Sequence, residues 1–284
     1  MAARSQSFLN LLARGVFGQS QSPYRALFDA AGIDFLAVER LTRDHGVDGA
    51  LERLYESGVW LKLEEFKGRR PIERSGLRLD VRAEDFDNPL VRPQFEGRTG
   101  GSRGTGRRLL LDLDLLTHDA ACHYLHLQSF DFIDGPMAMW RPVPPDNSGV
   151  KKALMNARMG GRLDRWFTQS PIRAGGGQFK FFLFTWHTLA GFRFYGGERL
   201  VPEYTPIAQA GKVARWLAQQ RERGRPAYLD TLASAAVRVC KAAAQSGLDI
   251  RGTLFRVGGE PLTPGKVRVI QESGCRVICH YSHV

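Results

Sequence analysis

The sequence predicts an α/β protein in which parallel or mixed strands are flanked by helices. Two observations support this fold class. The chain has 284 residues with 43% apolar content, which is enough for a sizeable packed core. Its last third alternates short apolar strands with amphipathic helices, the pattern of a parallel sheet. We therefore expect a helical lead-in over residues 1–58 and an α/β domain over residues 59–284.

The lead-in carries helix signals. Ser22 followed by Pro23 is typical of a helix start, because a capping hydroxyl precedes a ring that fits the first turn. Leu51 and Leu54 lie on one helix face, and Gly58 ends that helix. Apolar and polar residues then alternate in VWLKLEEF (59–66) and LRLDVR (77–82), which predicts entry into a sheet.

The middle of the chain predicts one strand and three helices. RRLLLDLDLL (107–116) alternates as a strand, and Thr117 is placed to cap the helix that follows. That helix carries His118, His123 and His126, to which we assign no role. Two later segments, VKKALMNARMGG (150–161) and TPIAQAGKVARWLAQQRERG (205–224), are further helices that end in glycine.

The tail has the clearest order, strand, helix, strand, helix and strand. Thr263 and Pro264 again give a cap followed by proline. The five segments are PAYLDT (226–231), ASAAVRVCKAAAQSG (233–247), GTLFRVGG (252–259), TPGKVRVIQESG (263–274) and CRVICHY (275–281).

The net charge of +11 would steer anions toward the surface. The basic residues are mostly arginines scattered from Arg4 to Arg276 without a long basic block. That distribution fits a compositional bias better than a nucleic-acid-binding stripe, so we expect no specific nucleic-acid partner.

Four cysteines without CxxC spacing indicate neither a disulfide framework nor a zinc knuckle, and the reducing cytoplasm is the expected compartment. Two alternatives are open for Cys275, Cys279, His280 and His283. They form a metal site, or they are ordinary residues of an alternating strand. No apolar run approaches the roughly 20 residues of a membrane span, so no membrane partner is expected. The first 28 residues fit either a transit peptide or a docked amphipathic helix.

A glycine- and arginine-rich loop, EGRTGGSRGTGRRLLLDLD, spans residues 96–114 between ordered elements. Its glycines would let backbone N–H groups approach phosphate oxygens, while its hydroxyls and guanidinium groups add donors and charge. It does not fit the GxxxxGK[ST] pattern, and an ordinary surface turn is the alternative. A second glycine turn, Gly258–Leu262, follows a predicted strand, and HYSHV ends the next one. Ligands of open α/β sheets bind beyond the carboxyl ends of strands, so these turns are expected to line one crevice.

With these three motifs the chain resembles the adenylate-forming, AMP-binding enzymes, particularly their phenylacetate–coenzyme A ligase-like branch. The family's phosphate loop, TSGTTGxPK, aligns without a gap with residues 99–107, although Gly100, Arg103 and Gly106 depart from it and Arg107 replaces its lysine. The family's adenine-contacting GGEPL turn is reproduced at Gly258–Leu262. Of its YGxTE motif only Tyr281 matches.

The resemblance, over roughly residues 60–284, implies an acid–thiol ligase that activates a carboxylic acid with ATP to an acyl-adenylate and then transfers the acyl group to a thiol such as coenzyme A. It implies ATP binding by the phosphate loop and the adenine turn. The magnesium-binding glutamate, the ribose-binding acid and the small domain with the catalytic lysine would lie beyond Val284, so we expect an incomplete and inactive part of the large domain, completed by a portion encoded downstream. The implied nucleotide-binding residues are Thr99, Gly100, Gly101, Ser102, Gly104, Thr105, Arg107, Gly258, Gly259, Glu260, Pro261 and Tyr281.

The aromatic segment FKFFLFTWHTLAGFRFYGG (179–197) falls where the family forms its acyl-substrate pocket. Trp186 and His187 would line that pocket, and a packed aromatic core is the alternative. Two other functions stay open for the whole chain. One is an arginine-rich nucleic-acid-binding protein, whose affinity would fall steeply with salt. The other is a nucleotide-binding scaffold without catalysis.

Overall fold

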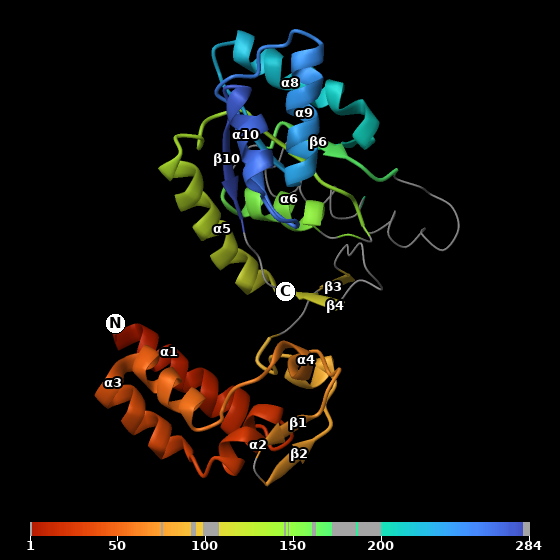
Figure 1. Cartoon of the computed structure of the whole chain (residues 1–284). Coiled ribbons are helices and arrows are strands. Elements are labelled where there is room, and N and C mark those ends of the chain that lie inside the picture. Colours follow the sequence, from red (N-terminus) through yellow and green to blue (C-terminus); the bar gives the residue numbers. More distant parts are fainter. Residues whose placement is uncertain are drawn as a thin grey trace. The chain divides into compact units, whose positions relative to one another are not determined.

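The computed structural model of the chain describes residues 2–74, 76–91, 95–98, 108–144, 146, 148–160, 163–171, 186 and 200–280. The chain forms two compact units, residues 1–92 and 93–284, whose elements are labelled in Figure 1. The expected boundary after residue 58 falls inside the first of these units. Within the described residues, no helix has the length and apolar character needed to cross a bilayer.

The first unit is a set of helices followed by a small hairpin. An apolar cluster that includes Val16, Phe28, Val38 and Leu54 joins the helices. The hairpin of β1 and β2 is antiparallel, and Ile72 packs with Leu27 of α2. The elements are α1 (Ala2–Leu12), a π-helical turn (Ala13–Phe17), α2 (Pro23–Ala30), α3 (Phe35–Glu56), α4 (Leu63–Phe66), β1 (Ile72–Arg74), β2 (Leu77–Leu79) and a 3-10 turn (Ala83–Phe86).

Two sequence predictions in this unit have different outcomes. α2 begins at Pro23 as expected, with Ser22 at the N-cap position, although the Ser22 side chain makes no capping hydrogen bond. The strand predicted over residues 59–66 is wrong, because Leu63–Phe66 form a short helix. Buried Glu65 explains the difference: its carboxylate accepts a hydrogen bond from the Lys62 backbone N–H at 2.7 Å and pairs with Arg74 at 3.0 Å. These contacts close a turn that alternation alone does not reveal.

The second unit is built on a six-stranded sheet with the order β10-β9-β8-β5-β6-β7, in which every pairing is parallel. The α/β fold class is therefore confirmed. A separate antiparallel pair, β3 (Phe95–Arg98) and β4 (Arg108–Leu111), flanks residues 99–107. The sheet strands are β5 (Met137–Trp140), β6 (Arg165–Thr168), β7 (Pro202–Tyr204), β8 (Tyr228–Thr231), β9 (Leu254–Val257) and β10 (Arg276–Cys279).

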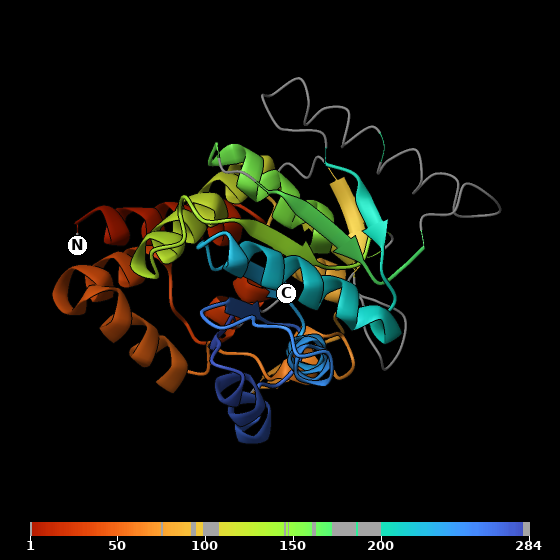
Figure 2. The same cartoon turned by 90° about the horizontal axis from the view of Figure 1, so that it is seen from above.

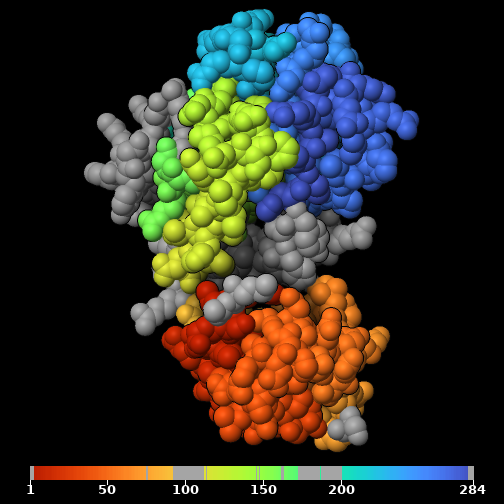
Figure 3. All heavy atoms as spheres, turned by 90° about the vertical axis from the view of Figure 1, so that its left-hand side faces the viewer, coloured from red at the N-terminus to blue at the C-terminus, as the bar shows by residue number. Residues whose placement is uncertain are grey.

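Helices cover both faces of this sheet (Figure 2). On one face lie α5 (Leu113–Ser129) and α6 (Ser148–Arg158), which pack on the cluster containing Met137, Met139 and Leu254. On the other lie α8 (Ala210–Glu222), which follows a 3-10 turn (Ile207–Gln209), α9 (Ala233–Gln245) and α10 (Pro264–Glu272). The unit therefore has three layers. Figure 3 shows α5, in yellow-green, on the surface beside the blue C-terminal elements of the same unit.

The predicted tail order is confirmed, since β8, α9, β9, α10 and β10 follow one another and the three strands are parallel neighbours. The predicted start of α5 at Thr117 is wrong. The helix begins at Leu113, because the Asp112 carboxylate caps it by accepting from the Asp114 N–H at 2.7 Å and the Leu115 N–H at 3.4 Å. An aspartate before the first turn satisfies free N–H groups as well as a threonine does, so the helix starts earlier.

Candidate functional site at the carboxyl edge of the sheet

Parallel strands end at the same edge of a sheet, and polar groups gather at this one. Arg141 follows β5, the Gly258–Gly259 turn follows β9, and His280 follows β10. β9 lies between β8 and β10 in the sheet, with Val257 opposite both Thr231 and Cys279. The strands that precede the last two turns are therefore neighbours, and the expected crevice stays a prediction.

The two glycines are required by close approach and by backbone conformation. A Cβ on Gly258 would lie 2.7 Å from the carbonyl oxygen of His280, closer than such contacts allow. Gly259 has a φ of +83°, which disfavours other residues. The Gly258 N–H donates to the Thr231 carbonyl at 3.4 Å, whereas Gly259 is exposed and has no side chain to screen its backbone from a ligand.

The carboxylate of Glu260 faces the start of α9. One oxygen accepts a hydrogen bond from the Ser234 backbone N–H, and the other pairs with Lys266 Nζ at 3.2 Å. Burial acts to raise the pKa of Glu260, but the hydrogen bonds from Ser234 and Lys266 hold that pKa below its usual value. Because the N-cap residue Leu232 offers no side-chain acceptor, Glu260 supplies the cap of α9 from a distant part of the chain.

A buried ionic network centred on Asp230 lies behind the turn. Arg141 Nε contacts one carboxylate oxygen of Asp230 at 2.6 Å, and Arg256 Nη1 contacts the other at 2.7 Å. Lys152 Nζ of α6 lies 3.5 Å from the same carboxylate. Arg141 also donates from Nη2 to the Thr231 carbonyl at 2.7 Å. Asp230 thus fixes the position of Arg141, which comes directly after β5.

The network carries a surplus of positive charge. A second carboxylate, Asp119 of α5, pairs with Lys151 at 2.6 Å, and its charge acts to raise the pKa of Arg256. Burial, and next the neighbouring Arg141, lower the pKa of Arg256 to about 10, so the guanidinium still carries its charge at neutral pH.

Arg141 brings part of this charge to the glycine turn. A Cβ on Gly259 would lie 3.9 Å from Arg141 Nη1, so that end of the guanidinium faces the turn. Its other two nitrogens are held by Asp230 and Thr231. Fixed positive charge beside this turn suits an anionic ligand.

His123 of α5 extends the polar region between α5 and the sheet. His123 is 4% exposed and its ring centroid lies 6.0 Å from that of Tyr228. Burial, followed by the charge of Arg256, lowers its pKa to about 4. Within the described part of the chain, His123 Nδ1, Tyr228 Oη and Arg256 Nε have no hydrogen-bond partner. The sequence had suggested no role for His123.

Several predicted site residues lie outside the described residues: Thr99, Gly100, Gly101, Ser102, Gly104, Thr105, Arg107, His187 and Tyr281. Of the predicted acyl pocket only Trp186 is described, and its side chain is 39% exposed. The structure brings together Gly258, Gly259 and the backbone of His280, and it turns the Glu260 side chain toward α9.

Cys275 and Cys279 lie in different environments. Cys275 is buried and its Sγ donates to the Ile250 carbonyl at 3.2 Å, whereas Cys279 is exposed. Across the described residues, no three His, Cys, Asp or Glu side chains are grouped so as to hold a metal ion. His283, the fourth candidate ligand, lies outside them.

Comparisons with known proteins give structural likeness only. No family model matches the sequence, and no curated protein matches it. Among solved structures, a 2-hydroxyisobutyryl-CoA ligase in complex with 2-HIB-AMP and CoA shares 16% identity at a TM-score of 0.47, covering 98% of this chain and 49% of that one. A luciferase-like enzyme from the nonluminescent Zophobas morio mealworm shares 8% identity at a TM-score of 0.38, covering 83% of this chain and 47% of that one. The chain spans about half the length of each.

Proposed function

We propose that this chain binds ATP at the carboxyl edge of its sheet, as part of an adenylate-forming enzyme that activates a carboxylic acid. The observation that carries the proposal is the Gly258–Gly259 turn at the end of β9, with the Arg141 guanidinium facing it. A glycine turn of sequence GGEPL at this edge of a parallel sheet is what the sequence resemblance predicts. The surplus charge of the Asp230 network favours a polyphosphate at the same edge.

In the proposed reaction an oxygen of the carboxylate attacks the α-phosphorus of ATP, and the bond to pyrophosphate breaks. The product is an acyl-adenylate, from which the acyl group passes to a thiol such as coenzyme A. Such chemistry depends on holding the phosphates and stabilising their charge more than on a protein nucleophile. We assign the phosphate contacts to residues 99–107, the base contacts to the Gly258–Pro261 turn and Tyr281, and the acyl pocket to Trp186 and His187.

The contacts of Glu260 support different roles for the side chains and the backbone of this turn. The Glu260 carboxylate accepts from the N-terminus of α9 and pairs with Lys266. We therefore assign the base contacts to the backbone of the turn. Asp230 is likewise engaged by three cations. The carboxylates that the structure describes at this edge therefore do not fit a magnesium site, and no step of the proposal passes through that ion.

The test compares two glycines that both have a positive φ. Gly259 and Gly247 have φ values of +83° and +65°, and Gly247 follows α9 at the other end of that helix. Gly259→Ala and Gly247→Ala should both destabilise the fold, because both place a Cβ at positive φ, and Gly259→Ala should cost somewhat more because its Cβ would lie 3.1 Å from Leu232 Cδ2. In calorimetric titrations of the 284-residue chain, only Gly259→Ala should weaken ATP binding, by about fivefold or more, the scale of one lost hydrogen bond.

Any of three results would contradict the proposal. The first is that the folded wild-type chain does not bind ATP, and the second is that both glycine variants bind ATP equally well. The third is that polyuridylate competes efficiently with ATP at physiological salt. The last result would instead support a general polyanion-binding surface, because such binding depends on counterion release.

A further inference from the structure

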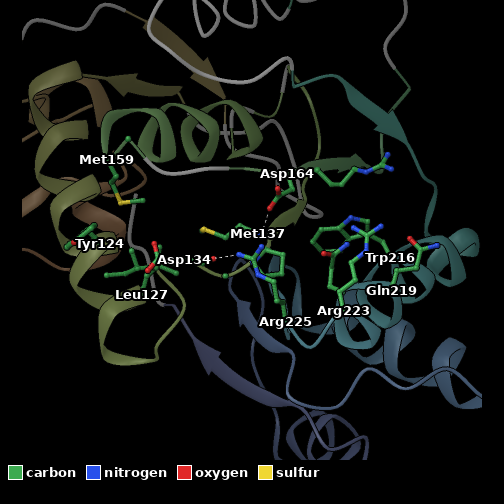
Figure 4. A pocket seen from close by; sticks show the side chains of 16 residues that line it. Tyr124, Leu127, Asp134, Met137, Met159, Asp164, Trp216, Gln219, Arg223 and Arg225 are labelled. Carbon is green, nitrogen blue, oxygen red and sulfur yellow. Dashed lines mark hydrogen bonds between the residues drawn. The ribbon is translucent and has the colours of Figure 1, made fainter.

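A cavity of about 540 Å³ opens at the amino edge of the sheet, the edge opposite the candidate nucleotide site (Figure 4). Its floor is formed where strands begin: Met137 starts β5 and Arg165 starts β6, while Arg225 lies just before β8. Strands of four residues are about 13 Å long, so the sheet itself separates this cavity from the carboxyl edge. Its volume is within the range of small-molecule sites.

One wall of the cavity is apolar. Tyr124 and Leu127 project from α5, and Met159 follows α6; Figure 4 shows these three side chains on the same side of the cavity. Leu127 is buried, whereas the Tyr124 side chain is 42% exposed and borders the opening. This wall offers an aromatic ring and a thioether to an apolar ligand group, both of which adapt to differently shaped partners.

The opposite wall is cationic. Arg223 makes no ion pair within the described residues, and neither does Arg225, whose Nη2 donates to the neutral carbonyl of Asp134. Arg165 also lines the cavity, but Glu203 neutralises it at 3.3 Å. Two carboxylates also line the cavity, those of Asp134 and Asp164, and Asp164 accepts a hydrogen bond from the Met137 backbone N–H at 2.8 Å. Arg223 and Arg225 are therefore the lining guanidinium groups without a carboxylate partner in the described residues, and Gln219 adds an amide to the same lining.

We propose that this cavity binds an organic carboxylate that carries an apolar arm. The carboxylate would take hydrogen bonds from Arg223 and Arg225, because a planar guanidinium matches two carboxylate oxygens. The arm would lie against Tyr124, Leu127 and Met159. The proposal does not depend on the function assigned to the carboxyl edge, since the two sites share no residue.

The ligand class is tested with three probes that separate charge from apolar contact. Octanoate carries both, acetate carries the charge alone, and octanol carries the arm alone. In calorimetric titrations of the full chain, octanoate should bind at least about tenfold more tightly than either of the others, since each loses one of two favourable contributions. Equal affinity for octanoate and octanol, or no octanoate binding, would overturn the proposal.

The location is tested with matched variants. Arg223→Gln combined with Arg225→Gln should weaken octanoate binding by about tenfold or more, as expected for loss of charge-assisted hydrogen bonds. Arg238→Gln changes an exposed arginine of α9 that does not line the cavity and should have no effect. Arg223→Gln alone serves if the double variant does not fold, because Arg223 is exposed and forms no ion pair in the described part of the chain. It should still weaken binding several-fold.

The apolar wall has its own pair of variants. Tyr124→Ser removes an exposed lining side chain, and Leu125→Ser removes its exposed neighbour on α5, which does not line the cavity. Only Tyr124→Ser should weaken octanoate, and it should leave the weaker acetate binding unchanged. Unaltered octanoate affinity in both the arginine and the Tyr124 variants would overturn the assignment to this cavity.

Discussion

The two faces of the central sheet differ although the same strands supply both. Toward α8, α9 and α10, the strands present apolar side chains such as Trp140, Leu229 and Phe255. Toward α5 and α6, alternate positions of β8 and β9 present Asp230 and Arg256, which are 3% and 4% exposed. The first face is an ordinary apolar core, and the second encloses charges next to the apolar cluster of Met137, Met139 and Leu254.

This difference indicates what each face is for. Burial of apolar side chains lowers the free energy of the folded state. Burial of charges removes their hydration, and an ion pair often does no more than offset that cost. A network such as that of Asp230 is therefore weak evidence for stability. Its visible effect is to hold Arg141 beside the Gly258–Gly259 turn. We infer that the apolar clusters on both faces stabilise the unit and that the charges between the sheet and α5 and α6 position groups for binding.

The largest expected effect comes from removing one charge at the centre of the polar face. Asp230→Asn conserves volume but leaves Arg141, Arg256 and Lys152 around a neutral amide, which should cost about 3–5 kcal/mol of unfolding free energy. Leu229→Met, on the apolar face of the same strand, also conserves volume and should cost less than about 1.5 kcal/mol. Urea denaturation of both variants measures the difference.

If the two variants lose equal stability, the charges on the polar face do not interact as the structure indicates. The Asp230→Asn chain, where folded, should also bind ATP more weakly than Leu229→Met, because Arg141 loses one of its two anchors.

Much of the fold could be predicted because its signals are local. Short apolar runs between capped helices identify β8, β9 and β10 and their parallel order. The errors arose where a side chain overrides the pattern. Asp112 caps α5 ahead of Thr117, and the contacts of Glu65 close a helical turn in an alternating segment.

The candidate site was less predictable because its contacts join distant positions. The GGEPL motif indicated the turn, but Asp230 pairs with Arg141, 89 residues earlier, and with Arg256, 26 residues later. A signal was present: YLDT and LFRV each carry a charged residue inside an apolar strand, and buried opposite charges usually pair. Alternation places each charge on a face but does not name its partner.

An effect of intermediate size on stability is expected when the pH is lowered, and it arises from His123 on the polar face. Burial lowers the pKa of His123 to about 4 from its usual 6.5. As the pH falls below 6.5, the unfolded chain therefore binds a proton that the folded chain does not, and stability decreases until about pH 4. At pH 5 the loss should be roughly 2 kcal/mol.

His123→Gln removes this contribution while other titrating groups stay the same. The difference in unfolding free energy between wild type and His123→Gln should change by that amount from pH 7 to pH 5, with the wild type losing more. Parallel curves for the two chains would mean that His123 is protonated as easily in the folded state as in the unfolded one.

The smallest expected effect concerns Glu260, where stabilising contacts and ATP binding at the carboxyl edge can be tested separately. Its carboxylate caps α9 through Ser234 and pairs with Lys266, both of them stabilising contacts within the chain. Glu260→Ala should cost about 1 kcal/mol of unfolding free energy, the usual loss for a helix cap. Glu260→Gln should cost less than half of that, because an amide oxygen still accepts from the Ser234 N–H and only the charge is lost. Neither change should alter ATP affinity by more than about twofold, because the side chain faces α9 while the backbone of the turn is left to the ligand. If Glu260→Gln instead weakens ATP binding as much as Gly259→Ala does, the carboxylate contacts the nucleotide, and the division between stabilising and binding groups at this edge is wrong.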